Sequence, residues 1–225
     1  MTSPDLVLAL LADARLPVGA HTQSAGFEPA AVHGGLTPAQ VPAFVAGRMA
    51  TVVAVEAGTA VVARHRALAL PDLTGADLAE VEDAWAARTP SQALRQASRT
   101  LGRGYLRLAR RLWPGEARLA ALSRTPARPV VLGVVAALAG LDAPRLVRLC
   151  GHEDVATVGA AVLKLAPGDP ADTAAWTLAA HPAIEALVTR TAGLRSPEEI
   201  PAAAAPLVEH QSLLHARTPR RLFHA

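Results

Sequence analysis

The chain has 225 residues, a length that allows one domain or two small ones and ample material for a core. Apolar residues make up 51% of it but aromatic residues only 3%, so Ala, Leu and Val must do the packing, which favours helices. The net charge is only +3, nearly all basic residues are Arg and no basic block occurs, which argues against a nucleic-acid-binding protein.

Cysteine usage and hydropathy indicate a cytoplasmic protein. The single cysteine, Cys150, excludes an internal disulfide and fits a reducing compartment. The first apolar segment, residues 6–12, is short and lacks a basic flank, so it resembles neither a signal peptide nor a membrane span. The longest apolar stretch, residues 130–141, is also too short to cross a bilayer.

Helix starts are marked by N-cap residues followed by proline, at Ser3-Pro4, Thr37-Pro38, Thr89-Pro90 and Ser196-Pro197. Asp142 and Asp169 are two further candidate caps. With the apolar periodicity these signals predict helices over residues 4–13, 24–33, 38–56, 58–69, 75–88, 90–112, 116–123, 129–140, 143–165, 170–190 (kinked at Pro182) and 197–204. We expect an all-α protein: one compact domain of about ten helices over residues 1–206, then a flexible C-terminal tail over residues 207–225.

Two segments are unusual for plain helical packing. Residues 16–28 combine a proline, two glycines and a polar run, a composition that indicates a sharp turn or a close approach to the backbone. The predicted helix 90–112 carries an arginine at every fourth position, and its apolar side and glycines predict close packing of a neighbour. The arginines are Arg95, Arg99, Arg103, Arg107 and Arg111. The residues expected to be buried are Leu94, Leu101, Tyr105, Leu108 and Leu112, and the glycines are Gly102 and Gly104. The arginine stripe is either a solvated face or a surface for an acidic partner.

No catalytic motif is present, so we expect no enzyme. Residues 101–104 lack the Lys-Ser/Thr ending of a phosphate loop, and neither G-x-S-x-G nor H-E-x-x-H occurs. The stretch from Cys150 to Asp154 does not place its potential ligands on one helix face. Three histidines near the C-terminus, His210, His215 and His224, are weak candidates for a transient nickel site.

Several ordered segments resemble the UreF family of urease accessory proteins. Residues 16–28, LPVGAHTQSAGFE, are similar to its amino-terminal signature. Further similarities follow in order along the chain: LRQAS with Gly102-Arg103, PVVLG at 129–133, AVLKLAPG at 161–168, and SLLH with RLF between residues 212 and 223. The chain departs from the family pattern at His21, Gln23, Ala25 and Ala216.

The resemblance implies an all-α, non-catalytic homodimer. Such a protein binds UreD (UreH) on one side and the GTPase UreG on the other, and the assembly delivers nickel to apo-urease after GTP hydrolysis. No cofactor would be tightly bound, and nickel would be transient cargo. Neither nucleic acid nor a membrane is an expected partner.

The resemblance also implies candidate partner-binding residues. In the first segment they are Pro17, Gly19, Ser24, Gly26 and Glu28; in the tail, for UreD, they are Ser212, His215, Arg221, Leu222 and Phe223. Arg95, Ser98, Gly102 and Arg103 are candidates for the dimer or GTPase surface. Each group has an alternative interpretation. The first segment would only pack the first two helices together, the tail would be a frayed terminus, and the residues of helix 90–112 would have a structural role.

Two other functions stay open at this point. One is a metallochaperone that carries nickel itself through the C-terminal histidines. The other is an unrelated helical protein such as a helix-turn-helix DNA reader, for which residues 90–112 are the one candidate and lack the short preceding helix.

Overall fold

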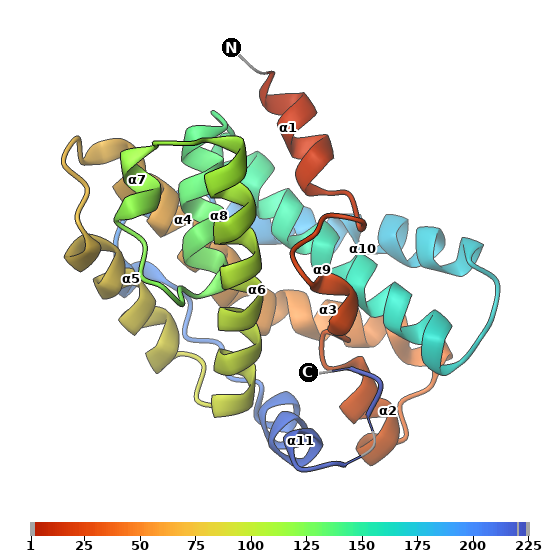
Figure 1. Cartoon of the computed structure of the whole chain (residues 1–225). Coiled ribbons are helices and arrows are strands. Elements are labelled where there is room, and N and C mark those ends of the chain that lie inside the picture. Colours follow the sequence, from red (N-terminus) through yellow and green to blue (C-terminus); the bar gives the residue numbers. More distant parts are fainter. Residues whose placement is uncertain (1–2, 220, 224–225) are drawn as a thin grey trace.

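The computed structural model describes residues 3–219 and 221–223, and every regular element within them is helical, which confirms the predicted all-α fold. In chain order the α-helices are α1 (Pro4–Leu11), α2 (Phe27–Gly34), α3 (Val41–Ala50), α4 (Val52–Ala69), α5 (Gly75–Ala87), α6 (Gln92–Leu112), α7 (Ala117–Ala120), α8 (Arg128–Leu138), α9 (Ala143–Leu165), α10 (Ala171–Thr191) and α11 (Pro206–Ala216). Short 3₁₀ turns lie at η1 (Ala20–Thr22), η2 (Pro38–Gln40) and η3 (Pro197–Glu199). Figure 1 shows them as one packed body.

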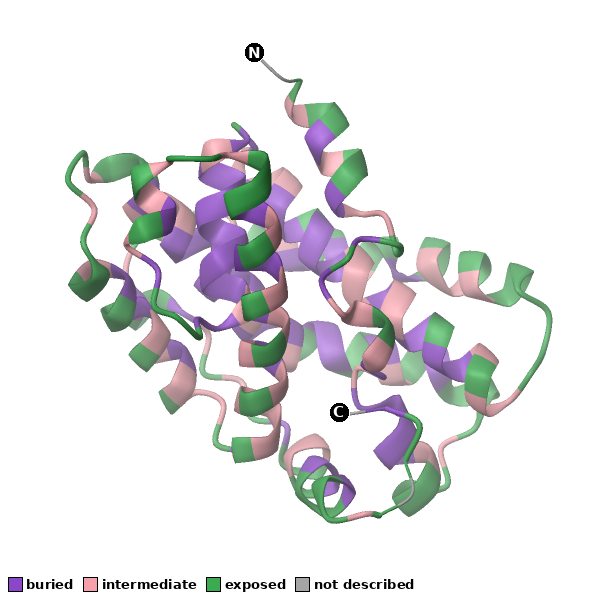
Figure 2. Cartoon of the chain, in the orientation of Figure 1, coloured by how far each residue is buried: buried purple, intermediate pink, exposed green. Residues whose placement is uncertain are grey.

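Helices α4 and α8 form the centre of the molecule and pack directly on each other. Every residue from 129 to 137 of α8 is buried, as is most of α4, and nearly all of these side chains are Val, Ala or Leu (Figure 2). Small side chains let the two helix backbones approach closely, which is how a chain so poor in aromatic residues fills its core.

The other helices cover this centre. Helix α9 packs on α4, α10 covers α9 and α3, α5 lies on α4, and α6 lies on α8. Helix α11 packs on α2 and α6, so segments near the two ends of the chain lie side by side (Figure 1).

Several predicted boundaries are shifted, among them the following three. Ser91, and not Thr89, caps α6, because the Ser91 hydroxyl accepts the amide of Leu94. The expected break between helices 38–56 and 58–69 falls instead at Thr51, where φ is −121° and ψ −94°. The helix expected over 197–204 is only the turn η3, although the capping box of Ser196 with Glu199 is present.

Part of the expected tail is a regular helix. Residues 206–216 form the regular helix α11, which begins with Pro206 in its first turn, and Phe223 beyond it is only 3% exposed. Proline at the first helical position is a standard start signal, because its missing N–H has no acceptor there anyway.

The buried side of α6 matches the expected one at Tyr105 but differs elsewhere. Ser98 and Gly102 are buried, whereas Leu94 and Leu101 are half-buried and Leu112 is 41% exposed. The cause is a close crossing with the chain before α8: a Cβ on Gly102 would lie 2.0 Å from the carbonyl oxygen of Pro126. The close packing predicted at Gly102 and Gly104 is thus confirmed.

Within residues 3–219 and 221–223 no single helix is long and apolar enough to cross a membrane. The segment of residues 38–50 and α4 together would be long and apolar enough, but the two are bent by 41° relative to each other. Most of α4 is buried in the core of the protein.

Candidate functional site

The segment 16–28, whose composition is unusual, folds as a compact double turn. Gly19 has φ +89° and Thr22 donates its hydroxyl to the Gly19 carbonyl at 2.8 Å. Ala25 and Gly26 follow with φ +50° and +77°, a left-handed pair that reverses the chain so that Phe27 starts α2 inside the core. Glycine is the residue that adopts such a backbone without strain.

Glu28 joins this segment to the C-terminal one. Its two carboxylate oxygens accept the backbone amides of Leu222 at 2.8 Å and Phe223 at 2.9 Å. The imidazole Nε2 of His215 lies 3.2 Å from the same carboxylate. Hydrogen bonds to an ionised, buried carboxylate are stronger than neutral ones. We call this group, Glu28 with His215, Leu222 and Phe223, the Glu28 clasp.

The tautomer of His215 is assigned from its neighbours. Nε2 also lies 3.2 Å from the carbonyl oxygen of Phe223, and both that oxygen and the Glu28 carboxylate can only accept. The proton is therefore on Nε2. Nδ1 is buried without a hydrogen-bond partner among the described atoms, so the imidazole makes its polar contacts through Nε2 alone in this part of the chain.

Two further contacts hold the C-terminal segment. Ser212 donates to the Glu209 carbonyl at 2.7 Å, so its 2.7 Å contact with Ser91 requires Ser91 to be the donor. The ammonium of Lys164 lies 4.9 Å from the centre of the Phe223 ring and donates to the carbonyl of His21. The tail is thus tied to α6, α9 and the N-terminal segment.

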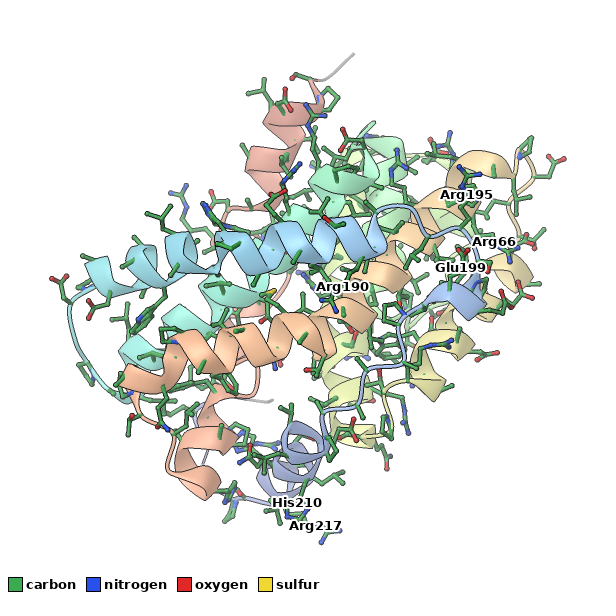
Figure 3. All side chains as sticks on the ribbon, turned by 180° about the vertical axis from the view of Figure 1, so that it is seen from behind. Arg66, Arg190, Arg195, Glu199, His210 and Arg217 are labelled. Carbon is green, nitrogen blue, oxygen red and sulfur yellow. The ribbon has the colours of Figure 1, made fainter. Side chains whose placement is uncertain are left out.

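Helix α11 is inverted relative to an ordinary surface helix. Its buried residues are polar: Gln211, Ser212 and His215. Its outer face, which we define as Leu207, His210, Leu213, Leu214 and Arg217, is exposed and rich in leucine; Figure 3 shows His210 and Arg217 there. Leu207 is 67% exposed and Leu222, just beyond the helix, 68%. Exposed leucines grouped on one surface are typical of protein interaction sites.

The structure separates the predicted partner-binding residues into exposed and buried ones. Those at the surface are Pro17, Arg103, Arg221 and Leu222; Gly19 and Arg95 are half-buried; Ser24, Gly26, Glu28, Ser98, Gly102, Ser212, His215 and Phe223 are buried. The motif residues therefore mostly shape the surface from beneath. Sequence reasoning missed the leucines of α11, which share a helical face once residues 206–216 are read as a helix.

The arginine stripe is partly engaged within the chain. Arg95 donates to the carbonyls of Thr89 and Pro90, and Arg99 pairs with Glu82 at 3.2 Å. Arg107 donates to the carbonyl of Pro17 at 3.0 Å, which connects α6 to the N-terminal segment.

The C-terminal histidines do not converge. His210 is exposed and His215 is buried in the Glu28 clasp, while His224 lies outside the described residues. In the part of the chain that is described, no three His, Cys, Asp or Glu side chains are placed to hold a metal ion.

A cavity of about 360 Å³ lies between α6, α9 and the N-terminal segment, and Phe223 forms part of its lining. On its floor Arg128 contacts both Glu56 and Glu153, Tyr105 donates its hydroxyl to Glu153, and the Trp85 indole donates to Glu56 at 2.9 Å. Burial raises the pKa of the Glu56 carboxyl, more than Arg128 lowers it. No sequence spacing could reveal this cluster, because its members come from five different helices.

Fold and surface together define a class: a single-domain all-α protein with clasped end segments, an open polar-floored cavity and an apolar surface helix. A sequence profile described as UreF matches residues 36–181. The chain is 34% identical over 224 residues to the urease accessory protein UreF of Mycobacterium sp. (strain JLS), covering 99% of both chains. It is 37% identical over 218 residues to that of Mycobacterium marinum, covering 96% of this chain and 97% of the other. The chain belongs to the UreF family of urease accessory proteins.

Proposed function

We propose that this protein is a non-catalytic scaffold for urease maturation, which joins UreD (UreH) to the GTPase UreG so that nickel is incorporated into apo-urease. It acts as a homodimer in the cytoplasm, a compartment that suits its buried, unpaired Cys150. The family supplies the context, and the observation that carries a binding role is the inverted helix α11, with polar residues buried and leucines exposed.

The outer face of α11, together with Leu222, is the surface that binds UreD. The Glu28 clasp holds this surface in place from beneath, which accounts for the presence of buried residues such as Glu28 and His215 in both conspicuous motifs. Arg103 of α6 is exposed and stays a candidate contact for UreG or for the dimer mate.

The test is co-expression with the cognate UreD and UreG, followed by size-exclusion chromatography with mass determination. Leu207→Asp combined with Leu214→Asp should abolish UreD binding, because burying the introduced aspartate carboxylates at an apolar interface would cost too much desolvation free energy. Leu178→Asp on α10 is the matched control, since Leu178 is 67% exposed, as Leu207 is. Wild-type binding by the double variant, with unchanged helical circular dichroism, would refute the assignment of this surface.

Direct nickel carriage is the second candidate function, favoured only by the imidazole of His210 on the outer face of α11. Equilibrium dialysis with nickel distinguishes the two. Stoichiometric sub-micromolar binding that is lost on replacing His210, His215 and His224 by Ala would support carriage by this chain over pure scaffolding.

A further inference from the structure

The cavity between α6 and α9 is large enough for a specific guest. Its volume of about 360 Å³ falls within the range of roughly 300–1,000 Å³ found for small-ligand sites. The guest need not displace any main-chain element, because the cavity is already open in the isolated chain.

The floor of this cavity is charged and reachable. Glu56, Arg128 and Glu153 lie deep in the molecule, yet each side chain keeps 15–18% of its surface accessible. All three line the cavity, so this accessible surface faces the cavity space. These three side chains therefore form the polar end of the cavity and can be reached from it, whereas an ion cluster sealed inside a core could not.

The charges on the floor do not balance. Arg48 and Asp154 form a closed pair with bonds of 2.9 and 2.6 Å. That leaves the single guanidinium of Arg128 between two carboxylates, and its contact with Glu56 is long, at 3.4 Å. When both carboxylates are ionised, one negative charge in this cluster has no partner. Such a charge is costly at this depth, and burial accordingly raises the pKa of Glu56.

The remaining titratable groups of the lining do not supply the missing cation. Arg88 and Lys164 keep their charges, but neither pairs with Glu56 among the described residues. Arg88 donates to the carbonyls of Ile200 and Ala84, and Lys164 donates to that of His21. The acids Asp13 and Glu209 also lie in the lining, with Asp13 held by Arg15 outside it, and the raised pKa of the Cys150 thiol keeps that group neutral. His21 is exposed. Among the described residues Arg128 is therefore the cation that contacts Glu56. A further cation beside this carboxylate would favour its ionised form, which burial disfavours.

The walls complete the chemical description of the guest. Leu94 and Leu101 of α6 face the cavity and are only half-buried, and Ala156 and Ala160 of α9 form part of the lining. A guest that matches this compartment has an apolar stem and a cationic end, as arginine and lysine side chains do.

We propose that the cavity receives an arginine or lysine side chain of a partner protein, with its aliphatic stem against α6 and its cationic group beside Glu56. A protein is the source because the lining includes Glu209 of α11 and Phe223 of the clasp, so the cavity adjoins the apolar surface assigned to UreD. In this respect the inference rests on the proposed function. The cavity adds a charge-specific anchor to an otherwise apolar interface.

The first test probes the cavity in the isolated protein. The Trp85 indole N–H is bonded to Glu56, so its ¹H–¹⁵N signal reports on that carboxylate; the variants Trp113→Phe and Trp176→Phe identify it among three indole signals. Butylguanidinium should shift this signal saturably, whereas butylurea, of the same shape but neutral, should not. Glu56→Gln should abolish the shift. Equal shifts from both compounds, or a shift that persists in Glu56→Gln, would overturn the cation site.

The second test measures the affinity of the protein for UreD. Glu56→Gln keeps the side-chain volume and an acceptor for Trp85, and should weaken the complex by at least about tenfold. Glu80→Gln is the matched control, since Glu80 lies on α5 with 60% of its side chain exposed. If Glu56→Gln binds UreD with wild-type affinity while the Leu207→Asp/Leu214→Asp variant does not bind, the proposed cation site is overturned and the scaffold role stays intact. Failure of the wild-type protein to bind UreD would overturn both.

Discussion

Gly104 is the position where a single methyl group should separate the N-terminal segment from the rest of the fold. A Cβ at this residue would lie 2.3 Å from the carbonyl oxygen of Val18 and 2.9 Å from its Cα, whereas real Cβ contacts are essentially never below 3.0 Å. The obstacle is backbone and not a flexible side chain. The segment around Val18 must therefore move away from α6.

The magnitude follows from two opposing effects. Forcing a methyl group into a packed site costs about 1–3 kcal/mol, and a rigid backbone neighbour places Gly104→Ala near the upper end. Alanine in place of glycine inside a helix recovers about 1 kcal/mol. The net loss of unfolding free energy is about 2 kcal/mol, which for a chain of this size lowers Tm by roughly 4–8 °C.

Gly47 supplies the matched control. It is also inside a helix, α3, but it is exposed and a Cβ there meets nothing within 4 Å. Gly47→Ala should therefore raise stability by about 1 kcal/mol. Urea unfolding followed by far-UV circular dichroism measures both. If Gly104→Ala proves as stable as wild type, or is stabilised like Gly47→Ala, the close approach of α6 to Val18 is refuted.

Four further variants or conditions test individual contacts. Glu28→Gln turns one acceptor of the clasp into a donor facing a backbone amide, so the tail should loosen by about 2 kcal/mol and trypsin should cleave at Arg217 faster; an unchanged cleavage rate would contradict the clasp. Asp154→Asn strips the partner from Arg48, which is 7% exposed, and should cost about 3–5 kcal/mol in thermal unfolding, with near-wild-type stability as the contrary result. The pKa of Glu56 is raised in the folded protein, so the contribution of this carboxyl to stability is full below its unfolded pKa and is lost as pH rises through its folded pKa. The Tm of Glu56→Gln minus the Tm of wild type should therefore increase with pH. A difference that does not change with pH would argue against the raised pKa. Burial raises the pKa of the Cys150 thiol to about 12, so a thiol reagent at mildly alkaline pH should label it slowly before unfolding and rapidly afterwards, whereas fast native labelling would show an open site.

Sequence reasoning reached the helices and their caps because those signals are local. Thr37 and Ser196 lie at the helix starts predicted there and form capping boxes with Gln40 and Glu199, and the predicted cap Asp142 accepts the amide of Arg145. The helix α11 within the expected tail is not predicted, because the leucines of a surface helix form no core-facing pattern.

The site required contacts that no local signal encodes. Glu28 and Phe223 are 195 residues apart, and the cavity floor joins Glu56, Tyr105, Arg128 and Glu153 from four helices. The resemblance singled out Glu28, His215 and Phe223 as important, but only the three-dimensional arrangement shows that they contact one another rather than the solvent.

The polar underside of α11 also bears on how the molecule opens. A helix that buries Gln211, Ser212 and His215 gains little from apolar burial, and its docking must offset the entropy of closing a very long stretch of chain. Its amides are therefore expected to exchange with solvent through local unfolding well below the free energy of global unfolding, while α4 and α8 exchange only in the global event. Association at the leucines of α11 would close off this local opening, so slowed hydrogen exchange in residues 206–216 would be the earliest sign that a partner has bound.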